Sequence, residues 1–248
     1  MTSAINAGRR YLPRGYADLG LQFLIWFGFL LVYQVARGVA DRDPARAFSN
    51  GWKVIDLEQR LAGLGELTFQ GWTQSSRVLE AAVSWTYWNS EFTVIGLALL
   101  WVYLRRNEAF IRFRNTILIA NVLGLIGYVL LPTAPPRFFT SVGFIDTVAQ
   151  FGGLNHGSGL VELAANPYAA MPSLHAADAL IVGVILASVV RHWIFKVMWL
   201  VWPLWVWFTV MATGNHFWLD VLAGIVLASL TMAFVYRREA RSFIAKLL

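Results

Sequence analysis

Long apolar segments, separated by short polar ones, follow one another along most of this chain. A helix needs about 20 mostly apolar residues to cross a bilayer. The segments that approach or exceed this length are 19–39, 78–104, 115–131, 174–190, 193–213 and 217–236. The pattern predicts an all-α polytopic membrane protein, a bundle of six transmembrane helices that forms a single membrane domain over residues 1–248.

The connection between the first two spans, residues 40–77, is the least hydrophobic stretch. Its apolar residues recur at near-helical spacing between charged ones: Trp52, Val54, Ile55, Leu57, Leu61, Leu64, Leu67, Phe69 and Trp72. This spacing predicts one or two amphipathic helices lying at the membrane interface. A cap packed on the protein itself fits the same spacing equally well.

Composition agrees with a membrane protein. Hydrophobic residues make up 58% of the chain and charged residues 14%, whereas about a quarter of the residues in a soluble domain are charged. Cysteine is absent, which excludes disulfides and thiolate metal sites. The net charge of +6 alone could indicate a nucleic-acid partner, but in a membrane protein the distribution of basic residues is more informative, and we expect none.

The first apolar segment follows Arg9, Arg10 and Arg14, as in a signal anchor. Gly38-Val39-Ala40 resembles a small-residue cleavage site, but an apolar stretch of this length favours retention. The first segment is therefore expected to remain as a span.

Basic residues concentrate on one side of the predicted bundle, which holds the N-terminus, the 105–114 and 191–196 loops and the C-terminus. They are Arg9, Arg10, Arg14, Arg105, Arg106, Arg112, Arg114, Arg191, Lys196, Arg237, Arg238, Arg241 and Lys246. Acids on this side are Asp18, Glu108 and Glu239. By the positive-inside rule this side is cytoplasmic, so we expect a plasma-membrane protein with both termini in the cytoplasm.

Three polar islands interrupt the apolar pattern: PTAPPR at 132–137, MPSLHA at 171–176 and TGNHFWLD at 213–220. Each lies at the end of a predicted span, and the topology places all three on the outer face. Ionisable residues near membrane depth indicate a functional site. We therefore expect the islands to form one extracytoplasmic site.

His216 and Asp220 lie four residues apart, on one helical face. A carboxylate that accepts a proton from one imidazole nitrogen leaves the other nitrogen able to attack or to accept a proton. A polar pair that only caps the helix would have the same spacing.

Pro172 and Ser173 are typical helix-start residues. The amides that follow would form an anion site, with Ser173 and His175 beside it. The alternative is that Ser173 is an ordinary N-cap and His175 an interfacial histidine without a function. A second histidine, His216, is expected at the same depth and makes this alternative less favourable.

Arg137 ends a proline-rich turn, and its guanidinium can bind two phosphate oxygens. An arginine that only contacts lipid headgroups is the alternative. Asp178, one turn after His175, is a candidate partner for His175 or Arg137. Glu80, Asn89 and Glu91 in the second span are further polar residues without an assigned role.

These islands resemble the type 2 phosphatidate phosphatase superfamily, over about residues 110–236. That superfamily carries K-x6-R-P, P-S-G-H and S-R-x5-H-x3-D in this order, at the outer ends of a six-helix bundle. Pro172-Ser173-Leu174-His175 matches the second block with leucine for glycine, and His216-x3-Asp220 matches the third. Leu130 and Val210 occupy the positions of the first-block lysine and third-block arginine, so two phosphate cations are missing.

The amino-acid sequences of the three islands are most similar to those of the inositol phosphorylceramide synthase branch, whose members transfer a phosphoryl headgroup between lipids. Lys53 and Arg60 are the candidates for replacing the missing cations, because Arg112 and Arg114 are expected on the other side. The branch implies an inositolphosphotransferase-like enzyme.

The resemblance implies a mechanism that needs no cofactor and no metal. His216 would form a phosphohistidine, Asp220 would orient it, and His175 would protonate the leaving oxygen and later deprotonate the acceptor. Arg137, Ser173 and Asn215 would bind the phosphoryl oxygens. The substrate would be a phospholipid or polyprenyl phosphate. A polyol or lipid hydroxyl as acceptor gives a phosphotransferase, and water gives a phosphatase.

Two other functions fit the same residues. A metal hydrolase would bind zinc through His156, His175, His216 and Asp220. A transporter or anionic-lipid-binding protein would use the polar cluster as an anion site, although the inverted repeats typical of many transporters are not visible in the sequence.

Overall fold

The computed structural model describes residues 12–39, 43–152 and 168–237, and over these residues it is helical. In chain order the helices are α2 (Gly15–Val39), α3 (Pro44–Leu61), α4 (Gly65–Gln74), α5 (Arg77–Ser90), α6 (Thr93–Arg105), α7 (Asn107–Leu130), α8 (Thr147–Gly152), α10 (Leu174–Val189), α11 (Trp193–Ala212) and α12 (Trp218–Val235). Two short 3-10 turns, η1 (Pro136–Phe138) and η2 (Thr140–Val142), follow α7. The predicted all-α class is confirmed for the described residues.

Four helices are long and apolar enough to cross a membrane: α2 over Gly15–Tyr33, α7, α11 and α12. The apolar helices α6 and α10 are shorter, with 13 and 16 residues. At 1.5 Å per residue, α10 is about 24 Å long, against a hydrocarbon thickness of about 30 Å. The membrane-protein class is thus confirmed, while the prediction of six full-length spans is not matched by helix length.

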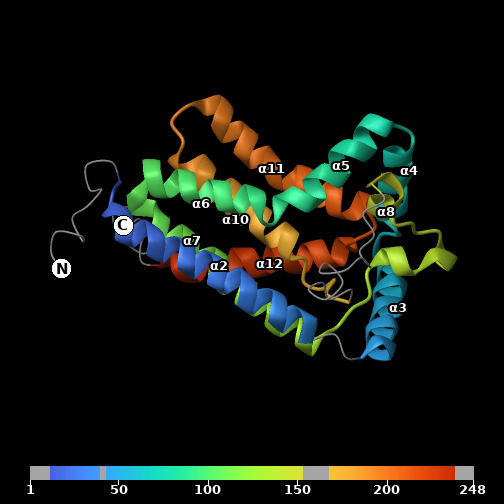
Figure 1. Ribbon diagram of the computed structural model, residues 1–248. Coiled ribbons are helices and arrows are strands. Elements are labelled where there is room, and N and C mark those ends of the chain that lie inside the picture. Colours follow the sequence, from blue (N-terminus) through green and yellow to red (C-terminus); the bar gives the residue numbers. More distant parts are fainter. Residues whose placement is uncertain (1–11, 40–42, 153–167, 238–248) are drawn as a thin grey trace, which may run out of the picture.

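The predicted second span, 78–104, is wrong as a continuous helix. It consists of α5 and α6, separated by a turn at Glu91 and Phe92, where the chain changes direction (Figure 1). The buried Glu91 at this turn points to partners on α2 and α10. Hydropathy alone does not reveal this turn, because apolar residues continue on both sides of it.

Helix α10 lies at the centre of the bundle and packs against α7, α11 and α12. Its own apolar side chains are buried on most of its sides, including Leu174, Ala177, Ile181, Val182 and Ile185. A central position is consistent with its nearly uninterrupted apolar sequence, since a helix that is apolar all round is buried. Its first turn carries one of the three islands.

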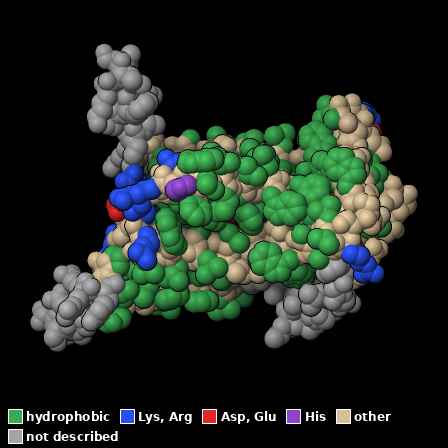
Figure 2. Space-filling view, turned by 90° about the horizontal axis from the view of Figure 1, so that it is seen from above, with side chains coloured by type: hydrophobic (Ala, Val, Ile, Leu, Met, Phe, Trp, Pro, Cys, Tyr) green, Lys and Arg blue, Asp and Glu red, His purple; other side chains and the backbone are tan. Residues whose placement is uncertain are grey.

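Lysine and arginine side chains gather at the end of the bundle where α2 begins and α12 ends (Figure 2). At this end, Arg14 Nε donates to Asn107 Oδ1 at 2.8 Å and Arg106 Nε donates to the Val189 oxygen at 2.9 Å. These bonds join α2, α7 and α10. The predicted basic residues Arg9, Arg10, Arg238, Arg241 and Lys246 lie outside the described residues, as does Ala40 of the cleavage-site-like segment.

Helix α3 lies across the opposite end of the bundle (Figure 1). Its buried face packs on the segment after α7 and on the start of α12, in a cluster of Ala47, Val54, Ile55, Ala134, Phe139, Phe144 and Phe217. Asn50 Nδ2 donates to the Pro132 oxygen at 2.8 Å, and the Ala134 amide donates to the Ala47 oxygen at 3.0 Å. The described part of the 40–77 segment is therefore packed on the protein.

Candidate active site

The three polar islands meet beneath α3. The Arg137 amide donates to the Gly214 oxygen at 2.8 Å, and the Ser173 amide donates to the Asp220 oxygen at 3.0 Å. These main-chain bonds join the first island to the third and the second to the third. Three segments that are well separated in the 248-residue chain are thereby fixed in one place.

A tight turn at Gly214 sets the position of the third island. Gly214 has φ of +72°, and a Cβ there would lie 2.4 Å from the Ile145 oxygen. Only glycine combines this left-handed conformation with such a close backbone approach. The turn releases the chain from α11 and presents Asn215 and His216 to the other islands.

A main-chain carbonyl holds the His216 ring. Nδ1 of His216 lies 2.9 Å from the Ala170 oxygen. Because a carbonyl oxygen only accepts hydrogen bonds, this contact assigns the proton to Nδ1 and the lone pair to Nε2. His216 is therefore oriented as a base or nucleophile acting through Nε2.

Asp220 is close to His216 but also caps its own helix. Its Oδ2 lies 3.6 Å from His216 Nδ1 and accepts the Phe217 amide at 2.9 Å. Its Oδ1 is buried and has no hydrogen-bond partner among the described residues. Nδ1 of His216 is therefore closer to the Ala170 oxygen than to the Asp220 carboxyl group that was expected to orient the ring.

His175, in the first turn of α10, has a carboxylate neighbour. Its Nε2 lies 3.4 Å from Glu91 Oε2, and its ring stacks on Tyr87 with the centroids 4.8 Å apart. Tyr33 donates to the other oxygen of Glu91 at 3.4 Å. Glu91 is a polar residue in an apolar segment, but nothing in its sequence neighbourhood indicates which histidine it contacts.

The two histidine rings face the same space. Their centroids are 5.8 Å apart, at an interplanar angle of 58°. Both side chains are buried, and each is held by an oxygen from another part of the chain. This separation allows both rings to contact a single phosphoryl group.

Ser173 caps α10 at its N-terminus. Its Oγ accepts the Ala176 amide at 3.3 Å, and the residue is fully buried. On α12, a Cβ at Gly224 would lie 2.2 Å from the Ser173 oxygen. The absence of a side chain at Gly224 therefore lets α12 approach the start of α10, where the first helical amides point outward.

Side chains from two other segments of the chain hold Arg137 in place. Its Nη1 donates to Asn215 Oδ1, its Nε lies 3.7 Å from Asp146 Oδ2, and its guanidinium lies 4.9 Å from the centre of the Phe138 ring. Asn215 Nδ2 in turn donates to Thr213 Oγ1 at 3.0 Å. The structure thus brings Arg137 and Asn215 together, as the predicted phosphate site requires.

Asp178 does not take the position suggested by its sequence spacing. Asn121 Nδ2 on α7 donates to both of its carboxylate oxygens, at 2.9 and 3.0 Å. Among the described residues, its hydrogen-bond partner is Asn121 rather than His175 or Arg137. The reason is geometric, because residue 178 faces α7 while His175 faces the α5–α6 turn.

Arg60 and Lys53, the two candidates for replacing the missing phosphate-binding cations, differ in their surroundings. Arg60 Nη2 forms an exposed ion pair with Asp56 on its own helix, at 2.8 Å. Lys53 lies beside Asn50, with Nζ 3.4 Å from Oδ1, at a groove next to the islands. Lys53 is therefore the better placed of the two.

This groove, which we call the α3–α12 groove, has a volume of about 560 Å³. It is lined by Asn50, Lys53, Val54, Leu57, Leu131, Thr133, Met171, Leu219, Leu222, Ala223 and Val226. Its polar residues are at the α3 end, and its apolar residues continue along α12. Met171 lies next to Ala170, whose carbonyl holds His216.

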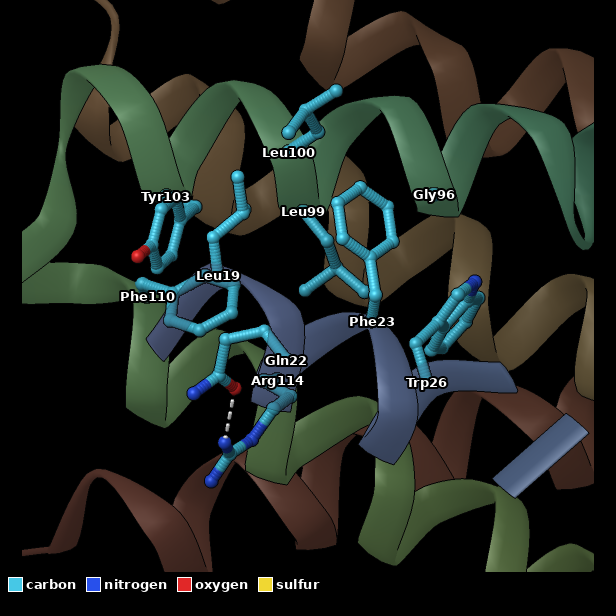
Figure 3. Close-up of a pocket in the computed structure, with 10 residues that line it drawn as sticks. All are labelled: Leu19, Gln22, Phe23, Trp26, Gly96, Leu99, Leu100, Tyr103, Phe110 and Arg114. Carbon is cyan, nitrogen blue, oxygen red and sulfur yellow. Dashed lines mark hydrogen bonds between the residues drawn. The ribbon is translucent and has the colours of Figure 1, made fainter. Parts of the chain in front are cut away.

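A second, apolar cleft lies between α2, α6 and α7 (Figure 3). Its volume is about 50 Å³, and Arg114 Nη1 donates to Gln22 Oε1 beside it at 2.6 Å. It contains none of the predicted site residues. We therefore assign it to the packing of the bundle.

Two buried glutamates that lie outside the three islands also contact the third island. Glu58 of α3 accepts the Leu219 amide at 2.9 Å, and Glu66 of α4 accepts the Trp218 amide. Both side chains are fully buried. They hold the first turn of α12, directly after His216.

In the described part of the chain, no three His, Asp or Glu side chains converge closely enough to hold a metal ion. His156, the further ligand of the zinc hypothesis, lies outside the described residues. The geometry of His175, His216 and Asp220 thus provides no zinc site by itself.

Comparison with known proteins gives a family and one curated relative. The model of the PAP2 superfamily matches residues 52–234. The phosphoinositol dihydroceramide synthase of Bacteroides thetaiotaomicron is 28% identical over 167 residues, which cover 62% of this chain and 54% of that protein. The match thus spans about half the length of the relative. No solved structure is significantly similar.

Proposed function

This chain belongs to the PAP2 superfamily, and from that premise we propose that it transfers a phosphorylated group from a membrane lipid to a hydroxyl acceptor through a phosphohistidine. The family and the relative support a lipid phosphotransferase or phosphatase. The histidine pair supports the finer proposal best, because its rings lie 5.8 Å apart and each is fixed by an oxygen.

In the first half-reaction, Nε2 of His216 attacks phosphorus. The new N–P bond forms as the bond from phosphorus to the leaving oxygen breaks. His175, with Glu91 beside its Nε2, gives a proton to the leaving oxygen. Splitting the transfer in this way replaces one difficult step by two easier ones.

In the second half-reaction, His175 takes the proton from the acceptor hydroxyl. The acceptor oxygen attacks phosphorus, the N–P bond breaks and His216 returns to its starting state. The Ala170 carbonyl keeps the His216 proton on Nδ1, and Asp220, 3.6 Å away, favours the positive charge that develops on the ring.

Arg137, Asn215, Ser173 and the first amides of α10 form the phosphate site of this proposal. An arginine held by its neighbours binds oxygens without losing much side-chain freedom, and a helix N-terminus favours negative charge. Arg137 has such neighbours in Asn215 and Asp146.

The substrate of this proposal is a phospholipid or a polyprenyl phosphate. Its apolar chain fits the α3–α12 groove, where Leu222 and Val226 are exposed along a membrane-length helix. Lys53 at the polar end supplies a positive charge for the phosphate, in the role left open by Leu130 and Val210.

We place six membrane-crossing segments in this protein, counting α5 with α6 and the shorter α10, with α3 and α4 at the outer interface. The basic end seen in Figure 2 is then cytoplasmic by the positive-inside rule, as are both termini. The histidine pair, at the opposite end, is extracytoplasmic.

The acceptor decides between a phosphotransferase and a phosphatase. We propose a hydroxyl of a polyol or lipid, with inositol phosphate as one transferred headgroup, because the relative is named for the synthesis of a phosphoinositol lipid. Hydrolysis, with water as acceptor, is the alternative reaction of the same site.

The test is to incubate the purified full chain with a panel of phospholipids, with and without inositol, other polyols or ceramides. Free phosphate and new lipids are followed by mass spectrometry. A new lipid that appears only with an added acceptor supports transfer, and phosphate release without acceptor supports hydrolysis.

His192→Ala is the matched control for His216→Ala, because His192 only caps α11 and is exposed. Activity that survives His216→Ala would overturn the mechanism.

A further inference from the structure

Two acidic side chains, Glu58 and Glu66, meet at the start of α12, and neither forms an ion pair with a basic residue in the described part of the chain. Glu58 and Glu66 lie next to one another, because both reach consecutive residues of α12. One oxygen of each accepts a main-chain amide of α12, from Leu219 and Trp218. The second oxygen of each, Oε2, is buried and has no other donor among the described residues.

Two ionised carboxylates cannot hydrogen-bond to each other, and unpaired charges are costly to bury. A metal ion would be one solution, but no three acidic or histidine side chains of the described residues are arranged to hold one. A single proton shared by the two carboxyl groups would remove one of the two charges and give the buried oxygens a donor. It converts two repelling groups into a charge-assisted hydrogen bond.

We propose that Glu58 and Glu66 share one proton, and that this acid–carboxylate pair positions the first turn of α12, and with it His216, for phosphoryl transfer. Both are positioning residues, since their contacts are with the helix that follows His216. The effect of the pair on catalysis rests on the proposed function. The shared proton itself does not depend on that function.

The surrounding helices indicate which glutamate carries the proton. Glu58 lies in the last turn of α3, where its main-chain oxygen accepts the Ala62 and Gly63 amides. Glu66 lies in the first turn of α4. Helix C-termini disfavour negative charge and N-termini favour it, so Glu58 is the neutral partner and Glu66 the ionised one.

The charges that act on Glu58 agree with this assignment. Burial, followed by the charge of Glu66, raises the pKa of Glu58 to about 9, with a smaller contribution from Asp220. Above this pH, three negative carboxylates would surround one helix terminus. Repulsion would then release α12 from α3 and α4 and move His216 away from the phosphoryl group.

The first arm of the test measures amide hydrogen exchange at Trp218 and Leu219 in the full chain in detergent. Glu58→Gln keeps a neutral donor and an acceptor, so protection stays as in wild type. Glu58→Ala removes both, and exchange is expected to rise by about tenfold, the size expected for the loss of a helix cap. Asp56→Asn, on the exposed face of the same helix, is the matched control and changes nothing.

The second arm measures the pH dependence of kcat for lipid turnover. Wild-type kcat falls above pH about 9, whereas Glu58→Gln, which has no proton to lose, lacks this fall. At neutral pH, Glu58→Ala lowers kcat by about tenfold with a smaller change in KM. A role in fold stability alone would make the fall in kcat coincide with unfolding, so the helical circular dichroism signal, recorded over the same pH range, is expected to stay constant while kcat falls.

Two results would overturn the proposal: exchange in Glu58→Gln that equals that in Glu58→Ala, or an alkaline fall in kcat that Glu58→Gln leaves unchanged. If Glu58→Ala does not fold, loss of protection in Glu58→Gln relative to wild type counts against the pair and retained protection supports it. If the wild type turns over no lipid, the proposed function fails, and the exchange arm still decides whether the pair holds α12.

Discussion

Glu91 Oε2 lies 3.4 Å from Nε2 of His175, so the turn between α5 and α6 reaches the first turn of α10. The contact explains why a glutamate interrupts a predicted span. It also places a carboxyl group beside His175, the residue that donates a proton in the first step of the proposed mechanism.

Glu91→Gln is therefore expected to lower kcat by about 10- to 100-fold, since general acid catalysis contributes about 100- to 10,000-fold in all. The fold should be retained, because glutamine still accepts from Tyr33. Steady-state kinetics measure the effect. Glu80→Gln, in the first turn of the same α5 helix, is the control and should match wild type. Equal activity of Glu91→Gln and Glu80→Gln would contradict the role of Glu91.

His216→Ala removes the proposed nucleophile, and turnover is expected to fall by at least about 10,000-fold, as for other enzymes that lose a covalent nucleophile. Rapid acid quenching of wild type with labelled lipid should trap a phosphorylated protein with the label on residue 216. Peptide mapping identifies the site. A labelled residue other than His216 would rule out this nucleophile.

Asp220→Asn should reduce turnover less than His216→Ala does. The Ala170 carbonyl still fixes the proton on Nδ1 of His216 in this variant, so the variant loses charge but keeps the tautomer. We expect a loss of about 100-fold, compared with about 10,000-fold where the aspartate alone sets the tautomer. Comparing kcat of the two variants tests this order, and a larger loss in Asp220→Asn would show that the carbonyl is insufficient.

Gly224→Ala should destabilise the protein, because the added Cβ would lie 2.2 Å from the Ser173 oxygen. Forcing a methyl group into such a contact costs about 1–3 kcal/mol. Thermal unfolding in detergent measures the loss. Gly20→Ala in α2, where a Cβ would meet nothing within 4 Å, is the control and should leave stability equal or slightly higher. Equal melting temperatures for Gly224→Ala and wild type would refute the close approach of α12 to α10.

Glu58→Gln should change the pH dependence of stability in a defined direction. The pKa of Glu58 is raised from 4.5 to about 9 in the fold, so the folded state binds more protons between these values. Its contribution is complete below pH 4.5 and is lost as pH rises to about 9. Wild type should therefore lose stability relative to Glu58→Gln over this range. Chemical unfolding at several pH values measures the difference, and parallel curves would argue against the raised pKa.

The sequence predicted the helical membrane class and the meeting of the three islands, because both depend on patterns that local residues carry. Hydropathy identifies the long apolar segments, and charge topology places 132–137, 171–176 and 213–220 at one end. The superfamily resemblance is confirmed by the family match.

What the sequence did not predict depends on contacts between distant segments. The partner of His216 is a main-chain oxygen at Ala170, which no residue type reveals. Glu91 stands out in the sequence as a polar residue in an apolar segment, but its partner, His175, lies on another helix. Asp178 was assigned by its spacing from His175, whereas packing turned it towards Asn121.

Glu58 and Glu66 illustrate the same limit. In the sequence they are ordinary charged positions of an amphipathic segment, and such positions usually face solvent. In the fold they are fully buried, because the free amides at the start of α12 require acceptors. Glu58 and Glu66 reach these amides only because α3 lies across the end of the bundle.

The α3–α12 groove has a consequence for how the proposed enzyme meets its substrate. Its apolar residues on α12 are exposed on the side of a membrane-length helix, so a lipid can enter sideways while its tail stays among the other tails. The enzyme and its lipid substrate then meet by diffusion within the plane of the bilayer. The rate should follow the mole fraction of the lipid in the membrane, and diluting the membranes themselves in buffer should leave it unchanged.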